Sequence, residues 1–306
     1  MGNWFKTALL LGIMTALIVI IGRLIGGQQG MIFAFILAMA MNFFSYWFSD
    51  KIVLSMYGAK EANPMENSRL YEIVRQITLR SDLPMPRIYI IPEDSPNAFA
   101  TGRNPEHAVV AVTEGLLRLM DTDEITGVLS HEMAHIKNRD ILIGSIAATM
   151  AGAIMIVANM ARWSAFLGGR SYNDRSGLGA IGLLIMSIFA PIAALLIQMA
   201  ISRSREYQAD STGAVFAGQP GGLARALEKL GAYSKRIPMQ SSSPNTAHMF
   251  IVNPLKGGNL ATLFSTHPPL EERIARLTGK RYFTDNTPLE KTGMKEAEDP
   301  WRRLMK

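Results

Sequence analysis

The chain has 306 residues, of which 48% are hydrophobic, and its mean hydropathy of +0.14 is high for a soluble enzyme. It contains no cysteine, which excludes a disulfide framework and agrees with a reducing compartment. The formal net charge of +6 suits a protein that lies against anionic lipid, and no run of basic residues with interleaved aromatics indicates nucleic acid as a partner.

Four stretches of the chain lack charged side chains, and each approaches or exceeds the roughly 20 residues that a helix needs to cross a bilayer. They are 7–22, 30–49, 141–161 and 178–201. The remaining apolar residues are too few to bury four such helices in a soluble core, so we predict four transmembrane helices, of which the last two could be tilted or only partly inserted. The first is expected to be a retained anchor, because Arg23 follows it and no small-residue cleavage site occurs.

Basic residues near the ends of these stretches predict the orientation. If both termini share one face, that face carries seven of them: Lys6, Lys51, Lys60, Lys137, Arg139, Arg203 and Arg205. The opposite face carries four: Arg23, Arg162, Arg170 and Arg175. The bias favours cytoplasmic termini. None of the four stretches holds an ionisable residue, which argues against a metal transporter and against a protease site buried in the bilayer.

After residue 50 the composition is that of a soluble domain. Apolar residues at helical spacing predict a helix around 70–77, and 87–91 reads as a strand between two prolines. Two further strands are predicted at 98–101 and 107–112, joined by a turn-rich segment. Such a hairpin could offer its edge to an extended peptide substrate, although the sequence alone favours an ordinary structural hairpin.

The segment 130–136 contains the motif H-E-x-x-H, formed by His131, Glu132 and His135. Asp121 and Glu124 form a capping box upstream of it, which predicts a helix that is expected to continue straight into the third apolar stretch. On a helix the two histidines lie on one face and can share a metal ion, with Glu132 beside the ion as a general base. The alternative is an amphipathic helix with two surface histidines.

A catalytic zinc of this kind needs a third protein ligand and an open position for water. No glutamate follows Glu132 before Glu206. Of the acids between them, Asp140 is expected to point elsewhere on the same helix, and Asp174 to lie across the membrane. Two apolar stretches separate His135 from Glu206, so the chain returns to the same face, with both sites roughly 8–9 Å outside the membrane core. The sequence therefore favours Glu206 as the third ligand.

Asp210 follows Glu206 by one helical turn and could accept a hydrogen bond from the outer nitrogen of a ligand histidine. The alternative is a solvated helix that carries two acids. Further helices are predicted around 223–230 and 270–277, a long loop at 237–258 and a peripheral tail from residue 283. His107 and His248 read as surface residues.

Four segments in this setting of four apolar stretches carry a family resemblance: His131-Glu132-Met133-Ala134-His135, Ser204-Arg205-Glu206-Tyr207-Gln208-Ala209-Asp210, Asn97-Ala98-Phe99 and Ser265-Thr266-His267-Pro268. Together they resemble the HtpX family of bacterial membrane zinc endopeptidases, which is related to the eukaryotic CAAX prenyl endopeptidase. The resemblance covers nearly the whole chain, with no departure at these motifs.

The resemblance implies a gluzincin-type enzyme in the bacterial inner membrane that acts on misfolded or damaged membrane proteins under stress. One zinc ion per chain would be bound by His131, His135 and Glu206, with Glu132 as the catalytic base. The strand Asn97-Ala98-Phe99 would border the substrate, and His267 would stabilise the oxyanion. From the residues alone, His267 is explained as well by a cap before a helix that begins after two prolines.

The expected fold is mainly α, with four transmembrane helices and a zincin-like α+β catalytic domain that carries a small antiparallel sheet. Residues 1–50 and 141–201 are expected to form two transmembrane hairpins, and 51–140 and 202–306 the cytoplasmic catalytic domain. The alternative function is a non-enzymatic membrane scaffold or chaperone stabilised by zinc, which would need a fourth protein ligand such as His267.

Overall fold

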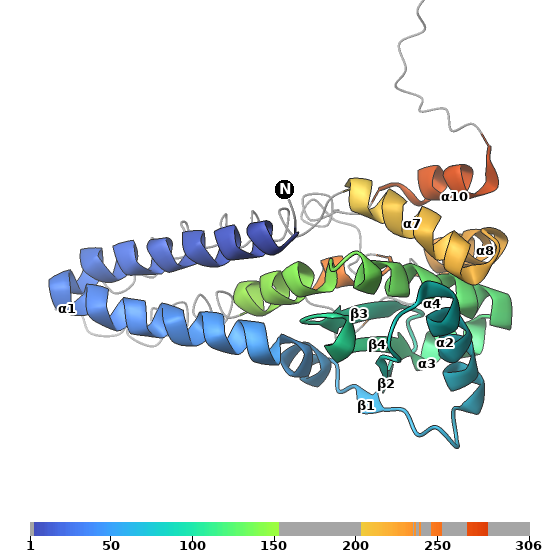
Figure 1. Cartoon of the computed structure of the whole chain (residues 1–306), viewed down its shortest axis with the longest axis horizontal. Helices are drawn as coiled ribbons and strands as arrows, with labels where there is room; N and C mark the ends of the chain where they lie inside the picture. Colours follow the sequence, from blue (N-terminus) through green and yellow to red (C-terminus); the bar gives the residue numbers. More distant parts are fainter. Residues whose placement is uncertain are drawn as a thin grey trace, which may run out of the picture.

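The computed structural model describes residues 3–152, 203–234, 236, 239, 246–252 and 268–280. A long helical hairpin projects from a globular part, in which helices cluster around a small four-stranded sheet (Figure 1). The described chain is therefore mainly helical. The apolar stretch 178–201, the end of the stretch 141–161, most of the predicted loop 237–258, the tail and His267 lie outside the described residues.

The N-terminal hairpin is the helix α1 (Asn3–Met56), which reverses direction near Gly27, where φ is 57°. A hydrogen bond of 2.8 Å from Asn42 Nδ2 to Thr15 Oγ1 joins its two arms. The second arm, Gly27–Met56, is the one helix in the described residues that is long and apolar enough to cross a membrane. The apolar helix Thr7–Ile20 and the described part of the next one, Ile141–Gly152, are shorter, so four spans stay a prediction.

The sheet contains β1 (Lys60–Glu61), β2 (Arg87–Ile91), β3 (Ala98–Gly102) and β4 (Ala108–Thr113), in the order β1-β2-β4-β3. The strand predicted at 87–91 and the hairpin predicted from 98 onward are confirmed. The expected all-antiparallel sheet is wrong, because β2 pairs with β4 in parallel. After β2 the chain crosses to the far edge as β3, and β4 then returns between them, antiparallel to β3 and parallel to β2.

The remaining described helices are α2 (Ser68–Ser81), α3 (Glu114–Leu119), α4 (Thr122–Lys137), α7 (Arg203–Ala217), α8 (Gly221–Ser234) and α10 (Leu270–Thr278), with the short 3₁₀ helices η1 (Pro105–His107) and η2 (Ala247–Met249). Helix α4 packs against β3 and β4, and α2, α7 and α8 pack in turn against α4. Residues of β4 are buried throughout, because alternate side chains face two apolar clusters. Val110 and Val112 face α2, α4 and α8, whereas Val109 and Ala111 face the end of α1 and Phe250. The sheet thus joins the hairpin to the helices that carry the site.

Helix α4 lies at the centre of the globular part and begins at the predicted capping box. Glu124 N–H donates to Asp121 Oδ1 at 2.9 Å, and Asp121 N–H donates to Glu124 Oε2 at 3.0 Å. The helix does not continue straight into the third apolar stretch, as the sequence led us to expect. It ends at Lys137, and Arg139 adopts a left-handed conformation with φ of 57°, so the helix that starts at Ile141 takes a new direction.

Candidate metal centre

The two histidines of the motif face each other from successive turns of α4. Their ring centroids lie 4.8 Å apart, and His131 Nε2 lies 3.2 Å from His135 Nε2. His131 is 1% exposed and His135 is 16% exposed at the side chain, so this is no pair of surface histidines. The alternative of an amphipathic helix with two solvated rings is therefore wrong.

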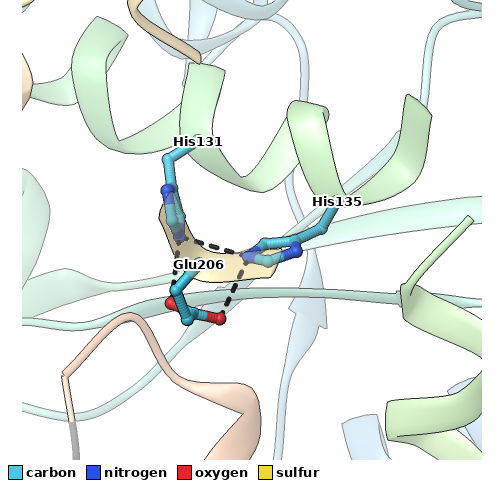
Figure 2. Close-up of side chains that lie close together, drawn as sticks. All are labelled: His131, His135 and Glu206. Carbon is cyan, nitrogen blue, oxygen red and sulfur yellow. Dashed lines mark hydrogen bonds and ion pairs between the residues drawn. The ribbon is translucent and has the colours of Figure 1, made fainter. Parts of the chain in front are cut away.

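Glu206 reaches the same point from α7, as Figure 2 shows. Its Oε2 lies 3.8 Å from His131 Nε2, and its Oε1 lies 3.6 Å from His135 Nε2. Helix α7 can approach α4 this closely because Gly213 has no side chain: a Cβ there would lie 2.9 Å from His131 N and Cα. The structure thus places Glu206 beside the two histidines, although two apolar stretches separate it from them in the sequence.

The donor atoms of these three residues fit a metal ion. All three lie within 4.8 Å of one another. A tetrahedral zinc with bonds of about 2.0–2.1 Å holds its ligand atoms roughly 3.3 Å apart, which is close to the observed separations. Two imidazoles and one carboxylate are also a donor set that zinc accepts in hydrolytic sites. The residues present therefore fit this ion.

Asp210 and Arg273 support the outer side of His131. Asp210 Oδ1 lies 3.0 Å from His131 Nδ1, as its position one turn after Glu206 predicted. Arg273, on α10, is fully buried and holds Asp210 through two bonds, from Nε at 2.9 Å and from Nη2 at 2.7 Å. Burial raises the pKa of the Asp210 carboxyl, but Arg273 and the bond to His131 outweigh this and lower the pKa to about 2. Asp210 is thus a fixed negative charge behind the ring.

Asp140 plays the same part for His135, and here the sequence prediction is wrong. We expected Asp140 to point elsewhere on a continuous helix. Because α4 ends at Lys137, the turn at Arg139 brings Asp140 back, so that its Oδ2 lies 3.3 Å from His135 Nδ1. Arg205 Nη1 lies 3.5 Å from the other oxygen of Asp140. Both histidines therefore present Nε2 to the centre while a carboxylate faces Nδ1.

The protonation of the two histidines differs. Burial lowers the pKa of His131 to about 4, helped by the nearby charges of Arg273 and His135 and opposed by the bond to Asp210. Burial also disfavours protonated His135, but the hydrogen bond to Asp140 and the charges of Glu206 and Glu132 outweigh it and raise its pKa to about 9. Without a metal ion, His135 therefore carries a proton at neutral pH, and a metal must displace it.

Glu132 lies beside the cluster, and it is 2% exposed. Burial, reinforced by the charge of Glu206, raises the pKa of its carboxyl to about 8, although His135 and a backbone hydrogen bond at Ala100 act in the opposite direction. Because the backbone group of Ala100 that can donate is its N–H, β3 fixes the orientation of the carboxylate. This pKa is that of the metal-free site, and the positive charge of a metal ion bound beside Glu132 would lower it and favour the carboxylate that accepts a proton.

A cavity of about 60 Å³ opens beside the cluster. Its wall includes Ala100, Ile141 and the segment 248–251, besides the cluster itself. His248 is buried, and its Nε2 lies 3.2 Å from the Gly144 carbonyl oxygen, so the prediction that it is a surface residue is wrong. Sequence reasoning also missed Arg273. Neither residue lies near the motif in the chain, so no local pattern could have found them.

The residues expected to border the substrate lie at the start of the edge strand β3. Asn97, Ala98 and Phe99 are all buried. Asn97 Nδ2 donates to the Val252 carbonyl at 2.9 Å, and Ile251 N–H donates to the Ala98 carbonyl at 3.1 Å. The segment 250–252 thus covers this end of the strand.

Comparisons with known proteins agree with one another. The family profile described as Peptidase family M48 matches residues 64–281. A "Protease HtpX homolog" from Desulfatibacillum aliphaticivorans is 66% identical over 289 residues, which cover 94% of this chain and 93% of that protein. A protein of the same name from Pyrococcus furiosus is 55% identical over 276 residues, which cover 90% of this chain and 95% of that protein. The crystal structure of S. mikatae Ste24p has a similar fold, with a TM-score of 0.52 at 18% identity, and the match covers 90% of this chain but only 65% of the length of Ste24p.

Proposed function

Because this chain belongs to peptidase family M48, we propose that it hydrolyses peptide bonds with a single zinc ion held by His131, His135 and Glu206. The protein is a membrane-associated metalloprotease. The observation that carries the residue assignment is the convergence of these three donor groups beside the buried carboxyl of Glu132. The relatives reported above are named proteases, and nothing supports the scaffold alternative.

Glu132 is the general base in this proposal. A zinc ion bound here would polarise the substrate carbonyl and make a water molecule more acidic. The Glu132 carboxylate takes the proton from the attacking water and delivers it to the nitrogen of the leaving amine. The hydrogen bond at Ala100 keeps the carboxylate oriented for both transfers, and the buried setting excludes competing water.

Asp210 and Asp140 act on the histidines rather than on the substrate. Each carboxylate holds the proton of a ligand histidine on Nδ1, which leaves the lone pair on Nε2 free to bind the metal. Arg273 in turn keeps Asp210 ionised and in place. These contacts support the assignment of His131 and His135 as ligands.

The edge strand β3 is the proposed support for the substrate, including Asn97, Ala98 and Phe99. An extended peptide can add to the edge of a sheet through backbone hydrogen bonds. Since 251–252 already bond to Asn97 and Ala98, the peptide must either displace that segment or pair further along β3. From the family resemblance alone, we also propose that His267 stabilises the oxyanion.

The proposed substrates are misfolded or damaged membrane proteins, and the proposed location is the bacterial inner membrane. In this arrangement 1–50 and 141–201 form two membrane hairpins, while 51–140 and 202–306 form the catalytic domain in the cytoplasm. The apolar arm Gly27–Met56 and the apolar start of the helix at Ile141 support this placement. Matched folded and misfolded membrane substrates test the preference: equal cleavage rates would contradict it.

The site assignment is tested with Glu132→Gln. Both proteins are purified in detergent with a chelator, given zinc, and assayed for self-cleavage and for loss of an unfolded test protein. The wild type should cleave only with zinc, whereas Glu132→Gln should bind one zinc ion and cleave nothing. Retained turnover in the variant would refute Glu132 as the base. Loss of zinc binding would show that Glu132 has a structural role in the metal site.

A further inference from the structure

A second and larger cavity lies away from the metal centre, where the second arm of α1 meets the sheet. Its volume is about 580 Å³, which is in the range of small-molecule binding sites. One wall is the end of α1, which reaches the sheet here (Figure 1), and the other is formed by the start of β2 and the turn between β3 and β4. Its lining consists of Phe43, Tyr46, Trp47, Phe48, Ser49, Asp50, Lys51, Arg87, Arg103 and His107.

The wall on α1 changes from apolar to basic along the helix. Phe43, Trp47 and Lys51 follow one another at four-residue spacing and therefore share one face. Phe43 is 54% exposed and Trp47 is 45% exposed, which is typical of residues that meet lipid or its headgroups. The order matches a phospholipid, whose chains lie in the apolar core and whose phosphate lies toward water.

The opposite wall is basic. Arg103 places its guanidinium carbon 4.6 Å from the centre of the Trp47 ring, so its charge lies at the level of the aromatic residue. Arg87 Nη2 bonds to Asp50 at 2.7 Å, which neutralises the one acid in the lining. Among the described residues, no acidic side chain forms an ion pair with Lys51 or Arg103. His107, whose Nδ1 lies 2.7 Å from Asn104 Oδ1, lines the same cavity. The cavity therefore complements a negative group.

We propose that this cavity binds the headgroup of an anionic phospholipid, with its phosphate against Arg103 and Lys51 and its chains along Phe43. The inference rests on the proposed placement of α1 in a bilayer, and it is independent of the chemistry at the metal centre. The site would fix the hairpin relative to the sheet, since its two walls come from these two parts of the chain. An inorganic phosphate ion would satisfy the charges but would leave the aromatic wall without a partner.

Tryptophan quenching by brominated lipids tests this site. The full chain, with Trp4, Trp163 and Trp301 replaced by phenylalanine, is placed in phosphatidylcholine vesicles, so that Trp47 is the reporter. Brominated phosphatidylglycerol should quench Trp47 more strongly than brominated phosphatidylcholine at equal mole fraction. Arg103→Gln should reduce this preference about fivefold, which corresponds to about 1 kcal/mol, and Arg103→Lys should keep most of it.

The matched control is Arg75→Gln, which removes the same charge from a side chain that is 70% exposed on α2. It should leave the preference unchanged. An equal loss in Arg75→Gln, or no preference in the parent protein, would overturn the proposal, as would displacement of the brominated lipid by excess inorganic phosphate. The preference is a ratio within one variant, so it does not depend on how much protein inserts. Cleavage by the parent protein is assayed separately, so a failed lipid site and a failed protease assignment are distinguishable.

Discussion

Gly213→Ala should push α7 away from the histidines of α4. A Cβ at this position would lie 2.9 Å from His131 N and Cα, whereas ordinary contacts of a Cβ begin at 3.4 Å. The difference requires the helices to part by about 0.5 Å, because the atoms that would be contacted belong to the backbone and cannot rotate away. Overpacking of this size costs about 1–3 kcal/mol of stability.

The displacement acts directly on Glu206, the proposed third metal ligand. Glu206 lies two turns before Gly213 on the same helix, and its oxygens are already 3.6 and 3.8 Å from the two Nε2 atoms. A metal must then either pull the helix back or accept a poorer third ligand. If the cost of about 1–3 kcal/mol falls on the bound state, zinc affinity drops by roughly 5- to 150-fold.

Competition with a chromophoric chelator measures this affinity, and thermal unfolding measures stability. Gly221→Ala is the matched control, because the nearest atom to its Cβ is the flexible end of Arg225 at an ordinary 3.5 Å. It should bind zinc as the wild type does. If Gly213→Ala also binds zinc with wild-type affinity and unfolds at the wild-type temperature, then the close approach of α7 to His131 does not set the ligand geometry.

Three further outcomes are expected. Arg273→Met should destabilise the protein by about 3–5 kcal/mol in denaturant titrations, because it leaves the Asp210 carboxylate buried without its partner. The double variant with Asp210→Asn should regain part of this stability. If Arg273→Met is as stable as the wild type, the ion pair is not needed for folding. Zinc binding at pH 7 should release protons and should strengthen as the pH rises toward 9, because His135, with its pKa raised to about 9, is protonated in the metal-free site. Calorimetry in buffers of different ionisation enthalpy counts the released protons. A count of zero would contradict the assignment of His135 as a ligand. Asp140→Asn should lower the pKa of His135, reduce the number of protons released, and weaken zinc binding about 10- to 100-fold, while the exposed Asp123→Asn should change neither quantity.

The sequence predicts well which side chains come together at the candidate metal centre, because its signals are geometric. A four-residue spacing on a helix places two rings on one face, and the capping box shows where α4 begins. Glu206 was predicted from the expectation that the two apolar stretches between it and His135 cross the membrane and return, and its position beside the histidines agrees with that expectation. Asp210 follows from the same helix register. In each case the inference needs only local periodicity and the predicted topology of the apolar stretches.

Other features depend on tertiary structure that no local pattern encodes. Hydrophobic alternation predicts strands but not their order, so the parallel pairing of β2 with β4 could not be read from the chain. No glycine or proline marks the end of α4 after Lys137, since it is Arg139 that takes the left-handed conformation. Without such a signal the sequence predicted a continuous helix, and the position of Asp140 was therefore predicted wrongly. Arg273 comes from α10, 63 residues beyond the aspartate that it holds.

That break after α4 also couples the candidate metal centre to the apolar helix that starts at Ile141. Asp140 immediately precedes this helix and faces His135 Nδ1, while Ser145, one turn further on, shares a hydrogen bond of 2.7 Å with Thr101 of β3. The same helix accepts a bond from His248 at the Gly144 carbonyl. A change in the tilt of this helix therefore cannot leave the site unaltered, because it moves the carboxylate behind one histidine and the neighbours of the strand that orients Glu132. A continuous helix would have pointed Asp140 away from His135 and separated the candidate metal centre from this apolar helix.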